Sequence, residues 1–280
     1  MPMEENIMSK KILAIVMSIV LVCGVVCAFA ACGNEPAKND DTTEAPAAAS
    51  DLAYIKEKGK MVIGITEYAP MNYYEGDKLV GFDTEFAEAV CEKLGVEAEF
   101  FIIADWGMKV NELDSKTIDC VWNGMTITDE LKGAMSISDP YVVNAQVIVT
   151  KAENAEKYKT AEDLKDADIA VESGSAGEKE VVALNLNAVP VKAQADALLE
   201  VQSGAVDACV IDITMAKAMT GEGTDYEALT YTGSLSEEFY GIGFRKGADT
   251  ADEVQKIINE LKADGTLDAL AKKYNLTLAE

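Results

Sequence analysis

Apolar segments of two kinds alternate along most of the chain. Short runs rich in β-branched residues, such as 61–66 and 168–172, predict buried strands. Between such runs, apolar residues recur at helical spacing, as they do over 83–94, and predict amphipathic helices. Strands that alternate with helices are typical of α/β folds, so we expect parallel sheets of the doubly wound kind. Further strands are predicted over 97–103, 146–150, 189–191, 207–211 and 240–245, and further helices over 195–203 and, as a pair, over 250–274.

Two stretches of the sequence echo one another. Residues 112–120 (ELDSKTIDC) and 200–208 (EVQSGAVDA) each read as a helix end, a tight turn and the start of a buried strand. The first strand leads to a polar residue at Asn123 and the second to one at Asp212. Two similar α/β halves, each offering a strand end, predict two lobes that face one cleft.

The connection that follows the first of these strands is suited to a small polar ligand. Gly124 allows the main chain to approach a ligand closely, and the chain restarts as a helix near Asp129, with Thr128 or Asp129 as its N-cap. Free N–H groups at such a helix start are typical of small-ligand sites. Taken alone, this stretch is equally compatible with an ordinary strand–turn–helix connection.

These residues carry a family resemblance. Residues 124–130 (GMTITDE) and 138–141 (SDPY) are similar to the signature of the amino-acid-binding extracytoplasmic receptors of ABC importers. Residues 64–70 (GITEYAP) resemble the family's first strand and cleft loop, 80–83 (VGFD) its first helix entry, and 264–274 its C-terminal helix. The resemblance covers about 61–274. It implies two Rossmann-like lobes with a hinge and a central cleft, the type II periplasmic-binding-protein fold.

The resemblance also implies ligand-binding residues. Aromatic walls are expected from Tyr68 and Trp106, although core packing would explain either ring, and Trp122 is expected in the strand core. Contacts to the amino and carboxylate groups of the ligand are implied for Asn123, Gly124 and Thr126, and a carboxylate for the α-amino group at Asp212. A lone Asp after a buried strand is otherwise more often a helix cap.

Two further candidates come from the residues of the second half. The loop 173–177 (SGSAG) opens a helix, so its N–H groups, with Ser175, suit an anion such as a carboxylate. Glu172 precedes this loop, and together with Glu67, Asp105 and Asp212 it makes the presumed cleft acidic. These acids favour a cationic ligand.

One position departs from the family pattern. The family usually has Arg directly after Thr-Asp-Glu, where a guanidinium clamps the ligand carboxylate, and here that residue is Leu131. The only Arg in the chain, Arg245, lies far along the sequence. Three explanations stay open: Lys132 holds the carboxylate, the amides of 173–177 hold it, or the ligand does not present one in the usual way.

The composition narrows the function classes. The 280 residues carry 24 Lys and Arg against 49 Asp and Glu, a formal net charge of −25, and no His. This balance argues against nucleic acid and anionic lipid headgroups as partners. It also removes the commonest general base and the commonest metal ligand, and we expect no cofactor and no metal. Three cysteines, Cys91, Cys120 and Cys209, lack metal-ligand spacing and are expected to be buried free thiols.

The N-terminal segment is typical of a processed leader. Two lysines precede the apolar run 12–31, which ends in Phe-Ala-Ala before Cys32. This order resembles a lipoprotein signal peptide over 1–31, cleaved so that Cys32 becomes the lipidated first residue, with Met1 or Met8 as the initiator. An uncleaved transmembrane anchor is the alternative. Residues 32–51 are polar and of low complexity, and predict a flexible tether.

Together these features predict a monomeric receptor at the outer face of the cytoplasmic membrane, held there by its lipid. Lobe 1 is expected over 52–140 and 241–280, lobe 2 over 146–235, and the crossovers 141–145 and 236–240 form the hinge. The receptor would capture a polar, cationic amino acid or related amine and deliver it to a membrane ABC permease. The alternative is a dehydratase-like enzyme of the same fold acting on a small carboxylic acid. Leu131 argues against that enzyme, while Glu172 could serve it as general acid.

Overall fold

The computed structural model describes residues 50–280, which belong to one compact unit. The predicted signal peptide, the lipidation at Cys32 and nearly all of the tether lie outside the described residues. Helix α1 (Asp51–Lys58) begins with Ser50 as its N-cap, and Asp249 accepts hydrogen bonds from the Ser50 hydroxyl and from the Leu52 N–H. The fold therefore starts slightly before Leu52, inside the range predicted as tether.

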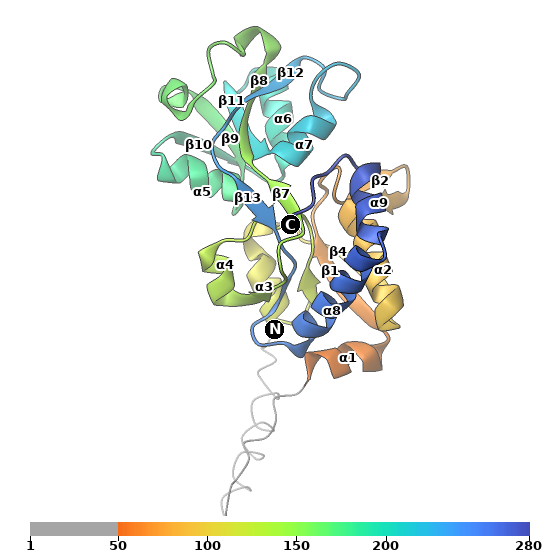
Figure 1. Cartoon of the computed structure of the whole chain (residues 1–280). Coiled ribbons are helices and arrows are strands. Elements are labelled where there is room, and N and C mark those ends of the chain that lie inside the picture. The colour runs from red at the N-terminus through yellow and green to blue at the C-terminus, as the bar shows by residue number, and fades with distance from the viewer. Residues whose placement is uncertain (1–49) are drawn as a thin grey trace, which may run out of the picture. The chain divides into compact units, whose positions relative to one another are not determined.

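Lobe 1 is built on a five-stranded sheet with the strand order β4-β1-β5-β14-β6 (Figure 1). Its strands are β1 (Lys60–Ile65), β4 (Glu97–Ile102), β5 (Cys120–Val121), β6 (Met135–Ile137) and β14 (Gly243–Arg245), with a hairpin of β2 (Tyr73–Glu75) and β3 (Lys78–Val80). Its helices are α1, α2 (Phe82–Leu94), α3 (Lys109–Asp114), α4 (Asp129–Ala134), α8 (Asp249–Ala263) and α9 (Thr266–Lys273). A 3-10 turn, η1 (Trp106–Met108), precedes α3.

Lobe 2 has a five-stranded sheet of its own, in the order β10-β9-β11-β8-β12. Its strands are β8 (Gln146–Lys151), β9 (Asp168–Glu172), β10 (Asn187–Val191), β11 (Ala208–Asp212) and β12 (Leu229–Ser234). Its helices are α5 (Ala176–Ala183), α6 (Gln194–Ser203) and α7 (Ile213–Met219), with 3-10 turns η2 (Ala152–Asn154) and η3 (Ala161–Leu164).

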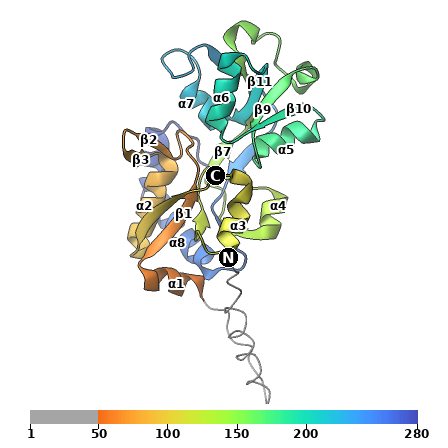
Figure 2. The ribbon, with the colours of Figure 1, turned by 180° about the vertical axis from the view of Figure 1, so that it is seen from behind.

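Both faces of each sheet are covered, because successive side chains of the strands enter opposite cores. Along β1, Met61 and Ile63 pack in the core that includes α2 and α8, whereas Val62 packs in the core that includes α3 and α4. Figures 1 and 2 show these two groups of helices on opposite sides of the lobe. Along β11, Cys209 packs towards α6 and Val210 towards α5. The expected doubly wound arrangement is therefore found in both halves.

The two sheets are not parallel throughout. Strand β14 runs antiparallel to β5 and β6 in the first sheet, and β8 runs antiparallel to β11 and β12 in the second. Each of these strands follows directly after a passage of the chain from the other lobe. A strand that enters from the opposite end of its sheet runs against the strands that its own lobe supplies.

Two short strands join the lobes. β7 (Val142–Asn144) pairs antiparallel with β13 (Glu238–Tyr240), and the segment 277–279 lies along β7, where the Val143 N–H donates to the Thr277 carbonyl. The predicted single strand 240–245 is wrong, because it is divided between β13 and β14. Tyr240 pairs with Val142 in the crossover, whereas Gly243 pairs with Val121 and Ile137 of the first sheet.

Arg245 is buried and holds parts of lobe 1 together. Its guanidinium donates to Asp51 (Nε–O 2.6 Å), to Asp119 (3.3 Å) and to the carbonyls of Leu113 and Ile118. Asp119 also accepts from Lys58 Nζ at 2.5 Å. The single Arg of the chain therefore has a structural role and does not face the cleft.

The three cysteines of the described residues are free and buried, as predicted. Burial raises the pKa of the Cys91 thiol to about 12 and raises those of Cys120 and Cys209 as well, so none carries a reactive thiolate at neutral pH. Among residues 50–280, no helix is long and apolar enough to cross a membrane. The same residues hold no cluster of three His, Cys, Asp or Glu side chains that could bind a metal ion.

We predict that Arg245→Met lowers the free energy of unfolding by about 3 kcal/mol, because it leaves the buried carboxylate of Asp119 without its guanidinium partner. Lys256→Met is the matched control: Lys256 pairs only with Glu253 on the exposed face of α8, so the change should stay within about 0.5 kcal/mol. Urea denaturation measures both. A loss below about 1 kcal/mol for the Arg245 variant would contradict this role.

Candidate functional site

A narrow pocket lies between the two lobes, with about 30 Å³ of space for the centres of water-sized molecules. All eight residues predicted to bind ligand line it: Tyr68, Trp106, Asn123, Gly124, Thr126, Glu172, Ser175 and Asp212. The other lining residues are Thr66, Glu67, Lys109, Met125, Thr128, Leu131, Gly174, Ala176, Lys179 and Gln194. The eight residues singled out in the sequence therefore lie together around one pocket.

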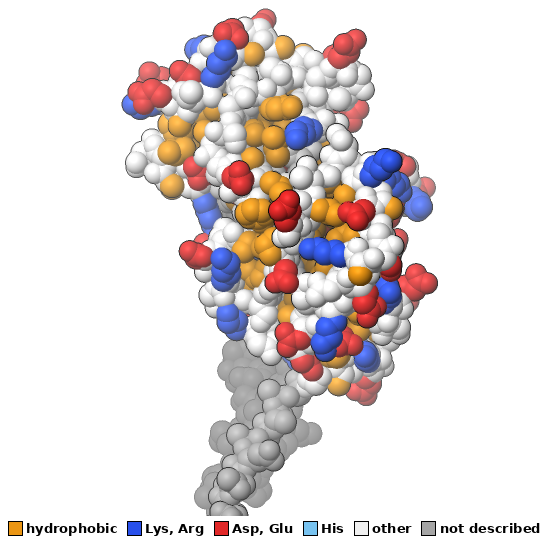
Figure 3. All heavy atoms as spheres, in the orientation of Figure 1, with side chains coloured by type: hydrophobic (Ala, Val, Ile, Leu, Met, Phe, Trp, Pro, Cys, Tyr) orange, Lys and Arg blue, Asp and Glu red, His pale blue; other side chains and the backbone are white. Residues whose placement is uncertain are grey.

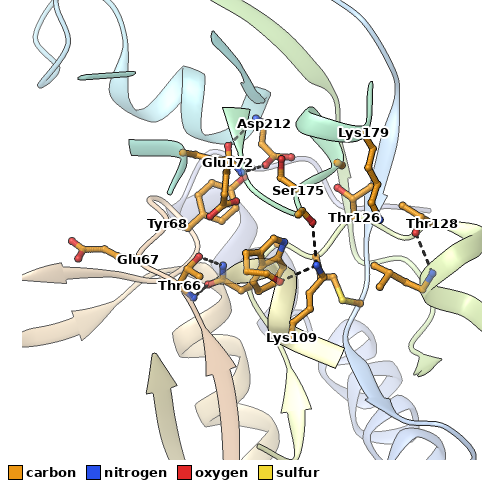
Figure 4. A pocket seen from close by; sticks show the side chains of 18 residues that line it. Thr66, Glu67, Tyr68, Lys109, Thr126, Thr128, Glu172, Ser175, Lys179 and Asp212 are labelled. Atoms are coloured by element: carbon orange, nitrogen blue, oxygen red, sulfur yellow. Dashed lines mark hydrogen bonds between the residues drawn. The ribbon is translucent and has the colours of Figure 1, made fainter. Parts of the chain in front are cut away.

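Two buried carboxyl groups form the wall that lobe 2 contributes. Asp212 ends β11 and Glu172 ends β9, so both lie at the carboxyl ends of neighbouring strands. Figure 4 shows them together on one side of the pocket. Burial, followed by the charge of Asp212, raises the pKa of Glu172 to about 8. Burial, followed by the charge of Glu238, raises that of Asp212 to about 6. Burial makes ionisation of these two carboxyl groups unfavourable, and a bound cation would reduce that free-energy cost.

Asp212 is held by side-chain amides. It is the residue before α7, yet it makes no capping hydrogen bond, so the alternative of a simple helix cap does not describe it. Its carboxylate accepts from the amides of Asn144, Gln146 (2.9 Å) and Gln194. Glu172 is only 4% exposed, and of these amides only that of Gln194 also interacts with its carboxyl group. Of the two acids, Glu172 is therefore the one left open to a ligand.

Two of these amides also donate hydrogen bonds to a third acid. Glu238 on β13 accepts from Asn144 (3.2 Å), from Gln146 (2.9 Å) and from the hydroxyl of Thr126 in lobe 1 (2.9 Å). The network thus includes both lobes and both crossover strands. Thr126, predicted as a direct ligand contact, has its hydroxyl donated to Glu238.

The two predicted aromatic residues do line the pocket. The hydroxyl of Tyr68 bonds with those of Thr214 in lobe 2 and Tyr240 in the crossover, both at 2.5 Å. Burial raises the pKa of Tyr68 well above its usual value, so it is a neutral phenol. Trp106 is buried, and Lys109 Nζ lies 4.7 Å from the centre of its indole ring. Trp122, expected in the core, packs edge-on against Phe86 and is fully buried.

The Asn123–Gly124 turn is held from within lobe 1. The Asn123 side chain accepts from the Thr66 N–H and from Asn72, and donates to the Thr66 hydroxyl at 2.7 Å. Gly124 has φ +55°, and a Cβ there would lie 2.6 Å from the ring of Tyr68. The expected close approach of Gly124 to a ligand is thus an approach to an aromatic wall, which only glycine allows.

Asp83 connects this turn to the first crossover. Its carboxylate accepts from the Gly124 N–H (2.6 Å) and from the hydroxyl of Tyr141 (2.9 Å). Burial raises the pKa of Asp83 to about 7. The N–H of Gly124 is therefore used inside the protein and does not face the pocket.

Two lysines are the basic residues of the pocket. Lys109 on α3 is 5% exposed, and its ammonium donates to the carbonyls of Trp106 (3.1 Å) and of Gly174 in lobe 2 (3.2 Å). Burial, followed by the like charge of Lys179, lowers the pKa of Lys109 to about 8. Lys179 on α5 is exposed and pairs across the lobes with Glu130 on α4 at 2.5 Å. In Figure 4, Lys109 reaches towards the acids from the opposite side of the pocket.

Two predicted contributors lie elsewhere. Lys132, one of the proposed replacements for the missing Arg, is exposed, pairs with Asp129 and does not line the pocket. Helix α4 presents Leu131 to the pocket and turns the next residue outwards. Asp105 is exposed and caps the Gly107 N–H, so only Glu67, Glu172 and Asp212 of the four predicted acids are pocket residues.

The loop before α5 brings the lobes together. Ser175 is the N-cap of α5, and its hydroxyl accepts from the Glu178 N–H, while the Gly174 N–H donates to the Glu178 carboxylate at 2.7 Å. A Cβ on Gly174 would lie 2.5 Å from the Cα of Gly107. The two backbones are therefore in direct contact across the cleft.

Sequence reasoning missed Lys109, Gln194, Asn144, Gln146 and Glu238. Gln194 begins α6, and its polar side chain at the start of an amphipathic helix resembles a solvent-exposed residue. Lys109 follows Trp106 by three residues, and a lysine one helical turn from a cleft aromatic residue was the available signal. The remaining three lie on the crossovers and at their ends, where short strands give little periodicity.

The comparisons agree with this geometry. The L-cystine-binding protein TcyJ of Escherichia coli K12 is 34% identical over 229 residues, 80% of this chain and 85% of that protein. The arginine-binding extracellular protein ArtP of Bacillus subtilis is 30% identical over 223 residues, 78% of this chain and 86% of that protein. Among solved structures, a mutant of the T. maritima arginine-binding protein ArgBP superposes with a TM-score of 0.75 at 32% identity, covering 80% of this chain and 98% of that one.

An ancestral amino acid-binding protein, described as a precursor of cyclohexadienyl dehydratase, superposes with a TM-score of 0.74 at 32% identity, over 80% of this chain and 99% of that one. Two α/β lobes with a polar pocket between them, together with these structural neighbours, define a type II periplasmic-binding-protein fold. The model for the bacterial extracellular solute-binding proteins, family 3, matches residues 61–277, and the chain belongs to that family.

We predict that Gly124→Ala destabilises the protein by about 1–3 kcal/mol, because the new methyl group meets the Tyr68 ring and alanine disfavours a positive φ. Gly133→Ala is the control: Gly133 lies in helix α4 with open space at its Cβ position, so alanine should leave stability unchanged or raise it by up to about 1 kcal/mol. Thermal and urea unfolding compare the two. Equal effects in both variants would contradict the close approach at Gly124.

Proposed function

We propose that this chain is a lipid-anchored receptor that captures a polar amino acid with a cationic side chain, or a related amine, and delivers it to a membrane ABC permease. The observation that carries the cationic ligand is the carboxyl pair of Glu172 and Asp212, buried side by side in the pocket wall. Both acids interact with the amide of Gln194, and no Lys or Arg of residues 50–280 forms an ion pair with Glu172. An ammonium or guanidinium group would add a charged donor and offset the charge of both acids.

Some of the relatives support the same class of ligand. Two of those described above are named for arginine, and a further structural neighbour, from Streptococcus pneumoniae, holds histidine. Others are named for cystine or glutamine, which are amino acids without a net positive charge. The dehydratase-like alternative would use Glu172 as general acid, and its raised pKa would keep the proton in place at neutral pH. The family and its named relatives bind solutes, and we do not propose catalysis.

Closure of the lobes is the second part of the proposal. The crossovers β7 and β13 would act as the hinge, because they are the short strands by which the chain passes between the two sheets.

The surface also suits an exposed receptor. Figure 3 shows acidic side chains spread over both lobes with basic ones among them. A highly charged surface of this kind favours solubility at high local concentration.

We predict that the affinity for L-arginine or L-lysine rises with pH by up to about tenfold per unit between pH 6 and pH 8, since one proton leaves Glu172 on binding. Below its pKa of about 8 the carboxyl group is protonated and must ionise to bind a cation. Glu172→Gln should remove most of this pH dependence, leaving the smaller effect of Asp212, whose pKa is about 6, and should lower affinity at pH 8 by about ten- to a hundredfold. Calorimetry in buffers of different ionisation enthalpy measures both.

The control for this series is Glu99→Gln, which alters a surface acid that pairs with Lys60 on the far edge strand β4. Its affinity and pH dependence should match those of the wild type. A flat affinity between pH 6 and pH 8, or a best ligand such as glutamate or aspartate, would rule out the cationic assignment.

The anchor rests on the sequence around Cys32, which lies outside the described residues. We predict that cells cleave the chain before Cys32 and attach lipid to its thiol, so Cys32→Ser should release the protein from the membrane or leave the leader uncut. Membrane fractionation and the mass of the mature chain measure this. Cys27→Ser, inside the predicted leader, is the control and should be processed normally. Unchanged retention and mass in the Cys32 variant would contradict the anchor.

A further inference from the structure

We infer that Lys109 binds the carboxylate of the ligand, in the role that the family gives to the Arg replaced here by Leu131. This inference rests on the proposed function, because it concerns the other end of the same amino acid. It assigns to the pocket a second charged subsite, opposite to the acids and carried by a different helix.

The first support is the burial of a cation without a counter-ion. Lys109 is 5% exposed, and no carboxylate among residues 50–280 forms an ion pair with its ammonium group. Its two partners are carbonyl oxygens, which solvate the charge without neutralising it. A buried charge is costly unless it is paired, so an anionic ligand group would supply what the protein omits.

The second support is a hydrogen-bond donor that stays available. A lysine ammonium has three N–H groups, and the carbonyls of Trp106 and Gly174 use two of them. Lys109 lines the pocket, and in Figure 4 its side chain extends into the space between the labelled residues. The third N–H can therefore serve a carboxylate in the pocket.

The third support comes from the neighbours of Lys109. Lys179, the other basic lining residue, already pairs with Glu130 at 2.5 Å, which leaves Lys109 as the cation to be neutralised. Leu131 lines the same pocket and is 6% exposed. Glu172 acts on Lys109 through space without bonding to it. A zwitterion could therefore place its carboxylate at Lys109 and its cationic group at Glu172.

Because Lys109 bonds to the Gly174 carbonyl, it also bridges the lobes. It donates from α3 in lobe 1 to the loop that precedes α5 in lobe 2, beside the contact between Gly107 and Gly174. A carboxylate held there would touch the group that joins the two lobes. Ligand recognition and lobe closure would then share one ammonium group.

The test compares amino acids with their decarboxylated amines. Calorimetry with L-arginine and agmatine, and with L-lysine and cadaverine, is carried out on the wild type, Lys109→Met and Lys132→Met. We expect Lys109→Met to weaken binding of the amino acids about ten- to a hundredfold, the effect of one charge-assisted hydrogen bond. Binding of the amines should fall clearly less, because they lose only the bond between Lys109 and the Gly174 carbonyl that joins the lobes. Lys132→Met, which alters an exposed lysine outside the pocket, should change neither.

Should Lys109→Met fail to fold, Lys109→Gln replaces it, because its amide keeps a donor for the two carbonyls. Equal losses for amino acid and amine, or no loss for either, would overturn the assignment of Lys109 and leave the cationic receptor standing. If the amines bind the wild type as tightly as the amino acids, the assignment of Lys109 is also overturned, while the cationic receptor still stands. If none of the four compounds binds the wild type, the proposed function fails and the inference falls with it.

Discussion

The hydrogen bonds around the carboxylate of Asp212 are the interaction on which the cleft depends. A buried carboxylate needs donors, and here Asn144, Gln146 and Gln194 supply them from the first crossover, the start of lobe 2 and helix α6. Two of these amides also bond to Glu238 in the second crossover. The strands that join the lobes therefore end on the same acid that faces the pocket, so the hinge and the binding wall are parts of one polar network.

This network determines how charge is distributed in the pocket. Amides stabilise Asp212 without neutralising it, and Glu172 beside it shares the amide of Gln194. Burial, followed by the charge of Asp212, raises the pKa of Glu172 to about 8. On the opposite side, Lys109 is solvated by two carbonyls and its pKa falls to about 8. The protein thus separates opposite charges across the pocket and pairs neither internally. A ligand that carries both charges would pair with the acids at one end and with Lys109 at the other. A ligand without charges would leave these buried charges unpaired.

The sequence predicted elements better than it predicted roles. Periodicity located most strands of the two sheets and the longer helices, but not strand β12 or helix α7. Thr128 is the N-cap of α4, as one of the two predicted candidates, because capping depends on residues only three apart. The strand over 240–245 failed, since a continuous apolar run does not reveal that it serves two sheets. Asn123 and Gly124 were located in the pocket, but their bonds run to Thr66, Asn72 and Asp83, some 40 to 60 residues away in the chain. Such long-range partners leave no local signal.

The contact between Gly107 and Gly174 sets a fixed limit on how near the two walls can come. Two backbones in direct contact cannot move aside as side chains do, so van der Waals contact between main-chain atoms sets the smallest width of the cleft at this point. A solute too small for that width would contact only one wall of the cleft. It would lose dispersion energy on the other side without any steric clash. Small solutes would then bind weakly because they fill the cleft incompletely. A larger residue in place of either glycine would increase the smallest width of the cleft and shift the preference of the receptor towards larger solutes.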